Sequence, residues 1–178
     1  VLIDRDDTWS GNPEIRMTNQ PHREYVYRMA YEMGRHVIGY EVQKVLALID
    51  FAGQELPGLP VGVWGYGEGG LVALCAGAAD TRIGAVGVSG YFRHRTRPWT
   101  EPIYRNVWRR CRGLTDAELA ALVAPRPLVV EARPGRVVDG PPPARPGRVA
   151  AAAPGRLEPA PREAVVAEAA LARRAYAC

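Results

Sequence analysis

The glycine cluster at residues 65–70 constrains the fold most, because it separates two apolar segments. Residues 60–65 form a short apolar run that starts at a proline, and residues 71–76 continue directly after the glycines as a second apolar run. This pattern predicts a strand, a tight turn and a helix in immediate succession. A third apolar run, residues 83–88, leads into Ser89 and Gly90 and predicts another strand.

Two amphipathic helices are predicted before the glycine cluster. From Pro21 to Gly34 apolar side chains recur at helical spacing, and Tyr25, Met29 and Met33 are expected to face the core. The second helix starts near residue 39 and ends before residue 53, with an apolar stripe made of Val42, Val45, Leu46 and Ile49.

Strands and helices alternate after the glycine cluster as well. Residues 114–123 favour a helix with Thr115 or Asp116 as its N-cap, and residues 126–131 favour a strand. Such alternation is typical of crossover units, so we expect an α/β fold with a parallel sheet covered by helices.

The composition changes after residue 132, which suggests three regions. Residues 1–132 hold the apolar segments, whereas residues 133–161 are rich in Pro, Gly, Ala and Arg, with Pro-Gly-Arg at 134, 146 and 154. We interpret residues 133–161 as a low-complexity linker, extended or disordered. Residues 162–178 are rich in alanine and favour a C-terminal helix with little to pack against.

Charge and cysteine content exclude several classes of protein. The chain has 178 residues and a formal charge of +4, with 23 basic residues of which only Lys44 is lysine. No stretch of apolar residues is long enough to span a membrane, and the cysteines show no C-x-x-C spacing. The opening residues, Val1 to Asp4, favour an apolar strand, so we expect the N-terminal part of the protein to be missing, and no localisation is predicted.

Gly65-x-Gly67-x-x-Gly70 formally matches the dinucleotide-binding fingerprint. That fingerprint requires an acidic residue at the end of the next strand, where this chain has Ser89 and Gly90. Glu68 would also place a carboxylate beside the phosphates. The pattern therefore disfavours dinucleotide binding but leaves it as an alternative.

The segment from Val61 to Leu71 resembles the G-x-S-x-G-G nucleophile elbow of the α/β-hydrolases, with Gly67 at the position of the serine. Residues 34–50 resemble the helix before the elbow in acetyl-xylan-esterase-like, dienelactone-hydrolase-like and prolyl-oligopeptidase-like members. Residues 124–130 resemble the strand that leads to the catalytic acid. The resemblance covers residues 1–132 and implies a three-layer parallel sheet, represented here by its middle strands.

The resemblance implies cofactor-free hydrolysis of an ester or peptide-like acyl bond, but glycine has no side chain to attack a carbonyl. The candidates for the catalytic acid are Glu131 and Asp139. Ser89 is the alternative candidate for the nucleophile, although a structural role in the turn accounts for this serine better. The backbone expected to form the elbow and oxyanion site comprises Gly65, Tyr66, Gly67, Glu68, Gly69 and Gly70.

The order of a triad in this family is nucleophile, acid, histidine, and the resemblance places the family's histidine beyond Cys178. His22, His36 and His94 all precede the predicted acid strand. We therefore predict a catalytically degenerate protein that binds a small acyl or ester ligand. A non-catalytic module that binds a ligand or a partner is the alternative, and no oligomeric state is predicted.

Two other groups of residues are better explained by structural roles than by functional ones. Asp4, Asp6 and Asp7 with His22 match no known metal-binding loop, so no metal site is predicted. Arginines and aromatic residues alternate in residues 93–99 and 104–112, but no nucleic-acid motif accompanies them. We interpret those segments as a rim with its arginines in solvent, an interpretation that disfavours nucleic-acid binding.

Overall fold

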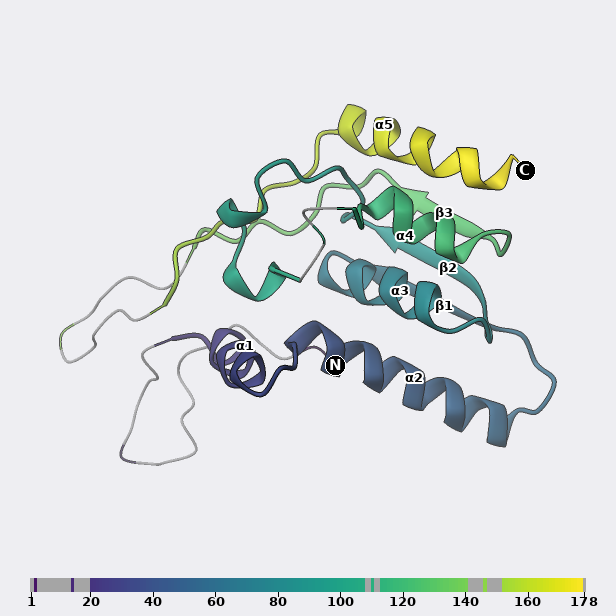
Figure 1. Ribbon diagram of the computed structural model, residues 1–178, viewed down its shortest axis with the longest axis horizontal. Helices are drawn as coiled ribbons and strands as arrows, with labels where there is room; N and C mark the ends of the chain where they lie inside the picture. The colour runs from purple at the N-terminus through teal and green to yellow at the C-terminus, as the bar shows by residue number, and fades with distance from the viewer. Residues whose placement is uncertain are drawn as a thin grey trace. The chain divides into compact units, whose positions relative to one another are not determined.

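A computed structural model describes residues 2, 14, 20–107, 110, 113–140, 146 and 152–177 (Figure 1). The chain divides into two compact units, each built from segments that are distant in sequence. The first unit comprises residues 1–40, 97–107 and 138–157. The second, called the sheet unit, comprises residues 41–96, 108–137 and 158–178.

The sheet unit contains three parallel strands in the order β1-β2-β3. They are β1 (Val61–Tyr66), β2 (Ile83–Ser89) and β3 (Leu128–Glu131). Val63 lies opposite Val86 in the register of β1 and β2, and Val86 lies opposite Leu128 in β3. The strands predicted at residues 60–65, 83–88 and 126–131 and their parallel arrangement are confirmed, and the fold class is therefore α/β.

The α3 helix (Glu68–Ala79) packs on one face of this sheet, and α4 (Asp116–Val123) packs against α3. A Cβ on Gly77 of α3 would collide with the Val86 side chain, so this helix lies very close to β2. The α5 helix (Arg162–Arg173) packs against α4 (Figure 1), and Glu168 of α5 accepts a hydrogen bond from the Ala117 amide at 2.8 Å. The expectation that the C-terminal helix has little to pack against is therefore wrong.

The opposite face of the sheet carries exposed apolar side chains. Trp64 and Tyr66 alternate with the residues of β1 that face α3, and Val129 lies on the same face of β3. Trp64 is 60% exposed and Val129 is 57% exposed. Within the described residues, these side chains therefore lack the helical cover expected on the second face of a three-layer sheet.

The α1 helix (His22–Glu32) buries the face that the sequence did not predict. Its buried residues are Arg23, Glu24, Tyr27 and Ala30, whereas Tyr25, Met29 and Met33 are 53%, 40% and 74% exposed. The polar residues are buried because they have partners. Arg23 stacks on the Tyr104 ring at 4.8 Å, and Glu24 accepts hydrogen bonds from Arg28 and from the Ala153 amide.

The α2 helix (Val37–Glu55) follows the predicted apolar stripe, since Ile49 is buried and Val42, Val45 and Leu46 are half-buried. In the sheet unit, Asp50 of α2 pairs with Arg82 at 2.7 Å. Short 3₁₀ turns complete the described elements: η1 (Pro98–Thr100), η2 (Ile103–Arg105) and η3 (Arg174–Tyr176).

Only part of the predicted linker at residues 133–161 is described. An isolated antiparallel bridge joins Val138 to Leu157, and the Arg156 amide donates to the Thr100 carbonyl at 2.8 Å. These contacts lie within the first unit. The predicted opening strand at residues 1–4 lies outside the described residues, apart from Leu2, and so do Asp6 and Asp7.

Candidate functional site

A single residue joins β1 to α3. Tyr66 ends the strand, Glu68 begins the helix, and Gly67 lies between them with φ 57° and ψ −119°. Its amide donates a hydrogen bond to the Ser89 carbonyl at 2.8 Å, which ties the turn to the end of β2. A positive φ of this kind strains any residue with a Cβ, so the abrupt turn favours glycine.

The neighbouring glycines of the turn have a different physical role. A Cβ on Gly65 would collide with the Gly69 carbonyl, and a Cβ on Gly70 would lie 3.2 Å from the side chains of Val88 and Tyr91. No atom lies within 4 Å of a Cβ built on Gly67. Gly65 and Gly70 therefore allow α3 to approach the sheet, whereas a side chain at position 67 would enter open space.

The first turn of α3 presents polar backbone groups at this edge of the sheet. Helix geometry leaves the amides of Glu68 and Gly69 without an acceptor inside the helix, and the helix dipole places partial positive charge there. The Glu68 side chain is only 5% exposed. Its nearby negative charge opposes anion binding, so the turn suits a neutral acceptor such as a carbonyl oxygen better than a carboxylate.

The structure brings two of the other candidate residues to the same sheet edge. Ser89 lies opposite Tyr66 in the register of β1 and β2, and Glu131 lies opposite Ser89 in β3. Ser89 is fully buried, and its hydroxyl has no hydrogen-bond partner among the described residues. Asp139 is exposed and belongs to the first unit.

Tyr66 connects the end of β1 to the segment that follows β3. Its hydroxyl donates to the Pro134 carbonyl at 2.8 Å. A Cβ on Gly90 would lie 2.7 Å from the Tyr66 ring, so the ring covers the backbone immediately after Ser89.

The histidines lie in different surroundings. The Nδ1 atom of His36 accepts from the Ile38 amide at 3.1 Å, and its Nε2 lies 3.2 Å from the Asn106 carbonyl. His36 is therefore a half-buried residue that is hydrogen-bonded to the backbone. The Nδ1 atom of His94 lies 3.8 Å from Glu168 Oε2. In the described part of the chain, no three metal-ligating side chains gather, and Asp4 lies outside that part.

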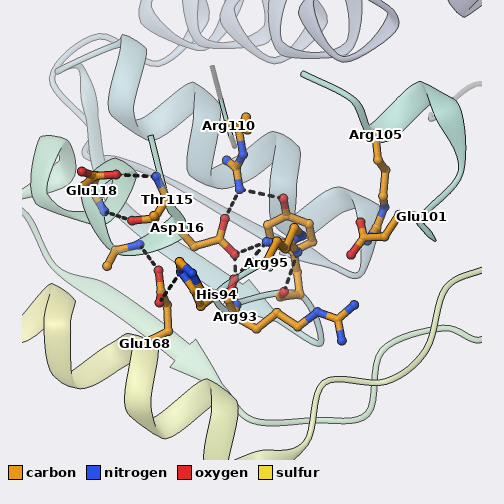
Figure 2. Close-up of polar contacts among 12 residues, drawn as sticks. Arg93, His94, Arg95, Glu101, Arg105, Arg110, Thr115, Asp116, Glu118 and Glu168 are labelled. Atoms are coloured by element: carbon orange, nitrogen blue, oxygen red, sulfur yellow. Dashed lines mark hydrogen bonds and ion pairs between the residues drawn. The ribbon is translucent and has the colours of Figure 1, made fainter. Parts of the chain in front are cut away.

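A buried charge cluster surrounds Asp116, the first residue of α4 (Figure 2). Arg95 donates to one carboxylate oxygen at 2.5 Å, Arg110 donates to the other, and the Arg93 amide donates to the first at 3.0 Å. Arg95 and Arg110 also contact Tyr91, through its carbonyl and its hydroxyl respectively.

The prediction that these arginines lie in solvent is wrong for Arg95 and Arg110. Their side chains are 11% and 8% exposed, and that of Asp116 is fully buried. The sequence pointed to Asp116 only as a possible helix cap, and the cap is in fact Thr115. The carboxylate of Asp116, four residues after the arginine-rich segment 104–112, was the signal that could have indicated the cluster.

Comparisons with known proteins give no relative: no family model, curated protein or solved structure matches this chain. Among the described residues, every helix is too short or too polar to cross a lipid bilayer.

Proposed function

We propose that the sheet unit represents part of an α/β-hydrolase-like fold, and that the turn at Gly67 binds a small acyl ligand without hydrolysing it. The observation that carries this proposal is the one-residue connection at Gly67, with positive φ and open space where a side chain would project. A sharp, strained turn between a strand and a helix is the geometry that a nucleophile elbow requires. The close contact between Gly65 and Gly69 supports the same interpretation.

The absence of turnover follows from the side chains at this edge. Gly67 offers no nucleophile, and Ser89 is buried without a base at hydrogen-bond distance among the described residues. An acyl-transfer mechanism needs an activated nucleophile whose base is itself held in place. Without these groups, the turn retains only its backbone amides as a means of recognition.

The Glu68 carboxylate determines which ligand the turn favours. The amides of Glu68 and Gly69 attract an acceptor, while the buried carboxylate of Glu68 repels a charged one. The expected ligand is therefore a neutral ester or amide carbonyl. Dinucleotide binding is the second candidate, but β2 ends at Ser89 and not at an acidic residue that would hold a ribose.

The experiment is a titration of the full chain with acetanilide, whose neutral amide carbonyl resists hydrolysis, followed by the NMR shifts of the Glu68 and Gly69 amides. We expect these two amides to shift and sodium acetate to leave them unchanged. The Glu68→Gln variant removes the negative charge, so acetate should then bind at least threefold more tightly than to the unmodified protein. Glu158→Gln, at an exposed position of the sheet unit, is the matched control.

Three results would contradict the proposal. Acetanilide could leave both amides unshifted. The unmodified protein could hydrolyse p-nitrophenyl acetate and lose that activity in Ser89→Ala, which would make Ser89 the nucleophile. Finally, a rise in Tm with NAD⁺ together with shifts at Gly65 and Gly70 would favour the dinucleotide alternative.

A further inference from the structure

A second concave site lies between β3 and α5, inside the sheet unit. It is a cavity of about 380 Å³, lined from the β3 side by Pro125, Pro127, Leu128 and Val130 and from the α5 side by Ala169, Ala172, Arg173 and Tyr176. All of these residues belong to the sheet unit, and α5 lies beside β3 in Figure 1. Pockets for small organic ligands enclose roughly 300–1,000 Å³, so the cavity is large enough for one.

The β3 wall of this cavity combines apolar side chains with the outer edge of the sheet. The Val86 amide donates to the Pro127 carbonyl at 2.9 Å, so the backbone groups of residues 127, 129 and 131 point toward β2. The amides and carbonyls of Leu128 and Val130 therefore point away from β2. Because β3 is the last strand in the order β1-β2-β3, no described strand pairs with this edge.

The opposite wall is one face of α5 and of the turn that follows it. Ala169, Ala172, Arg173 and Tyr176 are spaced three, four and seven residues apart, which places them on the same side of the helix. The two alanines are half-buried and buried, and their small side chains leave space between helix and strand. The two polar residues lie at the C-terminal end of this wall, so the wall is apolar at one end and polar at the other.

Arg173 is the only charged residue of the lining. It is exposed to solvent, and within the described part of the chain its guanidinium makes no hydrogen bond or ion pair. The carbonyls of Leu171 and Ala172 at the end of α5 already accept from the Arg174 amide, which reduces the negative charge that the helix end presents to a ligand. An accessible guanidinium of this kind suits a carboxylate, which it can bind through two parallel hydrogen bonds.

The Tyr176 hydroxyl is a second donor at the polar end of the cavity. It donates to the Ala120 carbonyl at 3.5 Å, which is long for a hydrogen bond between two oxygens. Burial raises the pKa of Tyr176, against the opposite effect of Arg126, so the hydroxyl keeps its proton at neutral pH. A carboxylate is a stronger acceptor than a distant carbonyl, and the hydroxyl can therefore turn toward a bound ligand.

We propose that the cavity between β3 and α5 binds a small apolar monocarboxylic acid as its carboxylate. The apolar body lies between α5 and the side chains of Leu128 and Val130, and the carboxylate accepts from Arg173 and Tyr176. A small polar ion would leave the apolar walls in contact with water, whereas a hydrocarbon would leave the guanidinium unused. An amphipathic ligand with a single negative charge satisfies both ends of the cavity, and this site is independent of the turn at Gly67.

The test is an NMR titration of the full chain with 3-phenylpropionate at constant ionic strength, because added salt screens charged sites. We expect a Kd of about 1 mM, with shifts at the amides of Ala169, Ala172 and Arg173 and none at Glu68 and Gly69. The neutral analogue 3-phenylpropanamide should bind about threefold more weakly, since an ion pair at the surface contributes modestly. Acetate lacks the apolar body and should bind at least about tenfold more weakly.

Two pairs of variants connect binding to the two ends of the cavity. Arg173→Gln should weaken the acid about threefold and leave the amide unchanged, so the preference for the acid disappears. Arg162→Gln, at the other end of α5, is its matched control and should retain the preference. Ala169→Leu fills the apolar end and should weaken both ligands about tenfold, because their phenyl group loses its place. Ala170→Leu, at an exposed position of the same helix, is the control for that substitution.

A preference for the acid that only Arg173→Gln abolishes is the result we expect. The proposal is overturned if 3-phenylpropionate at concentrations up to about 20 mM shifts none of the α5 amides. It is equally overturned if the unmodified protein binds the amide as tightly as the acid, or if Arg173→Gln retains the preference. Should Ala169→Leu not fold, the comparison of acid with amide in Arg173→Gln and Arg162→Gln decides the question, since both positions are exposed.

Discussion

Gly65 and Gly67 lie two residues apart, and each is a glycine for a different reason. Gly67 has open space around it but a φ of 57°, whereas Gly65 faces the Gly69 carbonyl. We expect Gly67→Ser to lower the free energy of unfolding by about 1–3 kcal/mol, the usual cost of a strained backbone residue. Gly65→Ala should cost more, because α3 must move away from β1.

Urea unfolding followed by circular dichroism measures both glycine substitutions. If Gly65→Ala proved milder than Gly67→Ser, the close approach of α3 to β1 would not be what requires glycine at position 65. Gly69→Ala provides the control, since no atom lies within 4 Å of its Cβ and its φ is ordinary.

Asp116 compensates two buried guanidinium groups, so its charge matters more than that of an exposed carboxylate. We expect Asp116→Asn to destabilise the protein by about 3–5 kcal/mol, because Arg95 and Arg110 would remain buried without a counter-charge. Asp50→Asn, which breaks an ion pair with both side chains 55% exposed, should barely change stability. Equal effects in thermal unfolding of the two variants would show that the cluster is not the buried network described.

At the scale of single elements, α4 begins with a reciprocal cap. The Thr115 hydroxyl accepts from the Glu118 amide, and the Glu118 carboxylate accepts from the Thr115 amide. We expect Thr115→Ala to cost about 1 kcal/mol and Thr115→Ser to recover most of it. Hydrogen exchange of the α4 amides is the measurement, and faster exchange confined to other helices would contradict the expectation.

Hydrogen bonds to Asp80, at the C-terminal end of α3, make the free energy of unfolding depend on pH. Asp80 accepts hydrogen bonds from the Arg82 amide and guanidinium, and these bonds lower the pKa of the Asp80 carboxyl. A carboxyl whose pKa is lower in the folded protein stabilises it above the unfolded pKa of about 4, and this stabilisation disappears as the pH falls through the folded pKa.

Asp80→Asn should therefore flatten the dependence of the unfolding free energy on pH below about pH 4. Urea titrations at several pH values measure the slope. An unchanged slope in that range would show that the Asp80 carboxyl gains nothing from Arg82 in the folded protein.

Local sequence patterns predicted elements better than they predicted which faces are buried. The apolar runs and glycines located β1, β2 and α3, because strand and helix formation there depend on neighbouring residues. The buried face of α1 was predicted wrongly because its polar residues find partners far along the chain, as the bond between Glu24 and the Ala153 amide shows. Periodicity contains no information about such partners.

One part of the candidate site was located from the sequence, and another part was missed. The turn at Gly67 follows from adjacent residues and was located from the sequence, and parallel pairing brings Ser89 and Glu131 to its sheet edge. The Asp116 cluster was missed because Arg95 and Arg110 become buried only when two separate loop segments meet the start of α4. Arginine-rich segments are exposed in most proteins, so composition favoured the wrong interpretation.

At the scale of the whole molecule, the chain passes through the first unit before it returns to complete the sheet unit with α5. Val165 and Ala172 are buried at 4% exposure each, and Glu168 is the hydrogen-bond acceptor for the Ala117 amide. Removal of residues 161–178 would expose α4 and leave this amide unpaired. We expect a loss of at least ~3 kcal/mol in the free energy of unfolding, from apolar burial and one hydrogen bond together.

Glu168→Gln separates the two contributions, because glutamine retains an acceptor for the Ala117 amide while the apolar contacts of α5 stay intact. This variant should lose far less stability than the truncated chain. Equilibrium unfolding in urea provides the comparison, and the m-value shows whether the truncated chain has also become less compact. If truncation lowered the free energy of unfolding no more than Glu168→Gln does, α5 would not contribute to the stability of the sheet unit. The residues up to β3 would then be sufficient for that unit to fold.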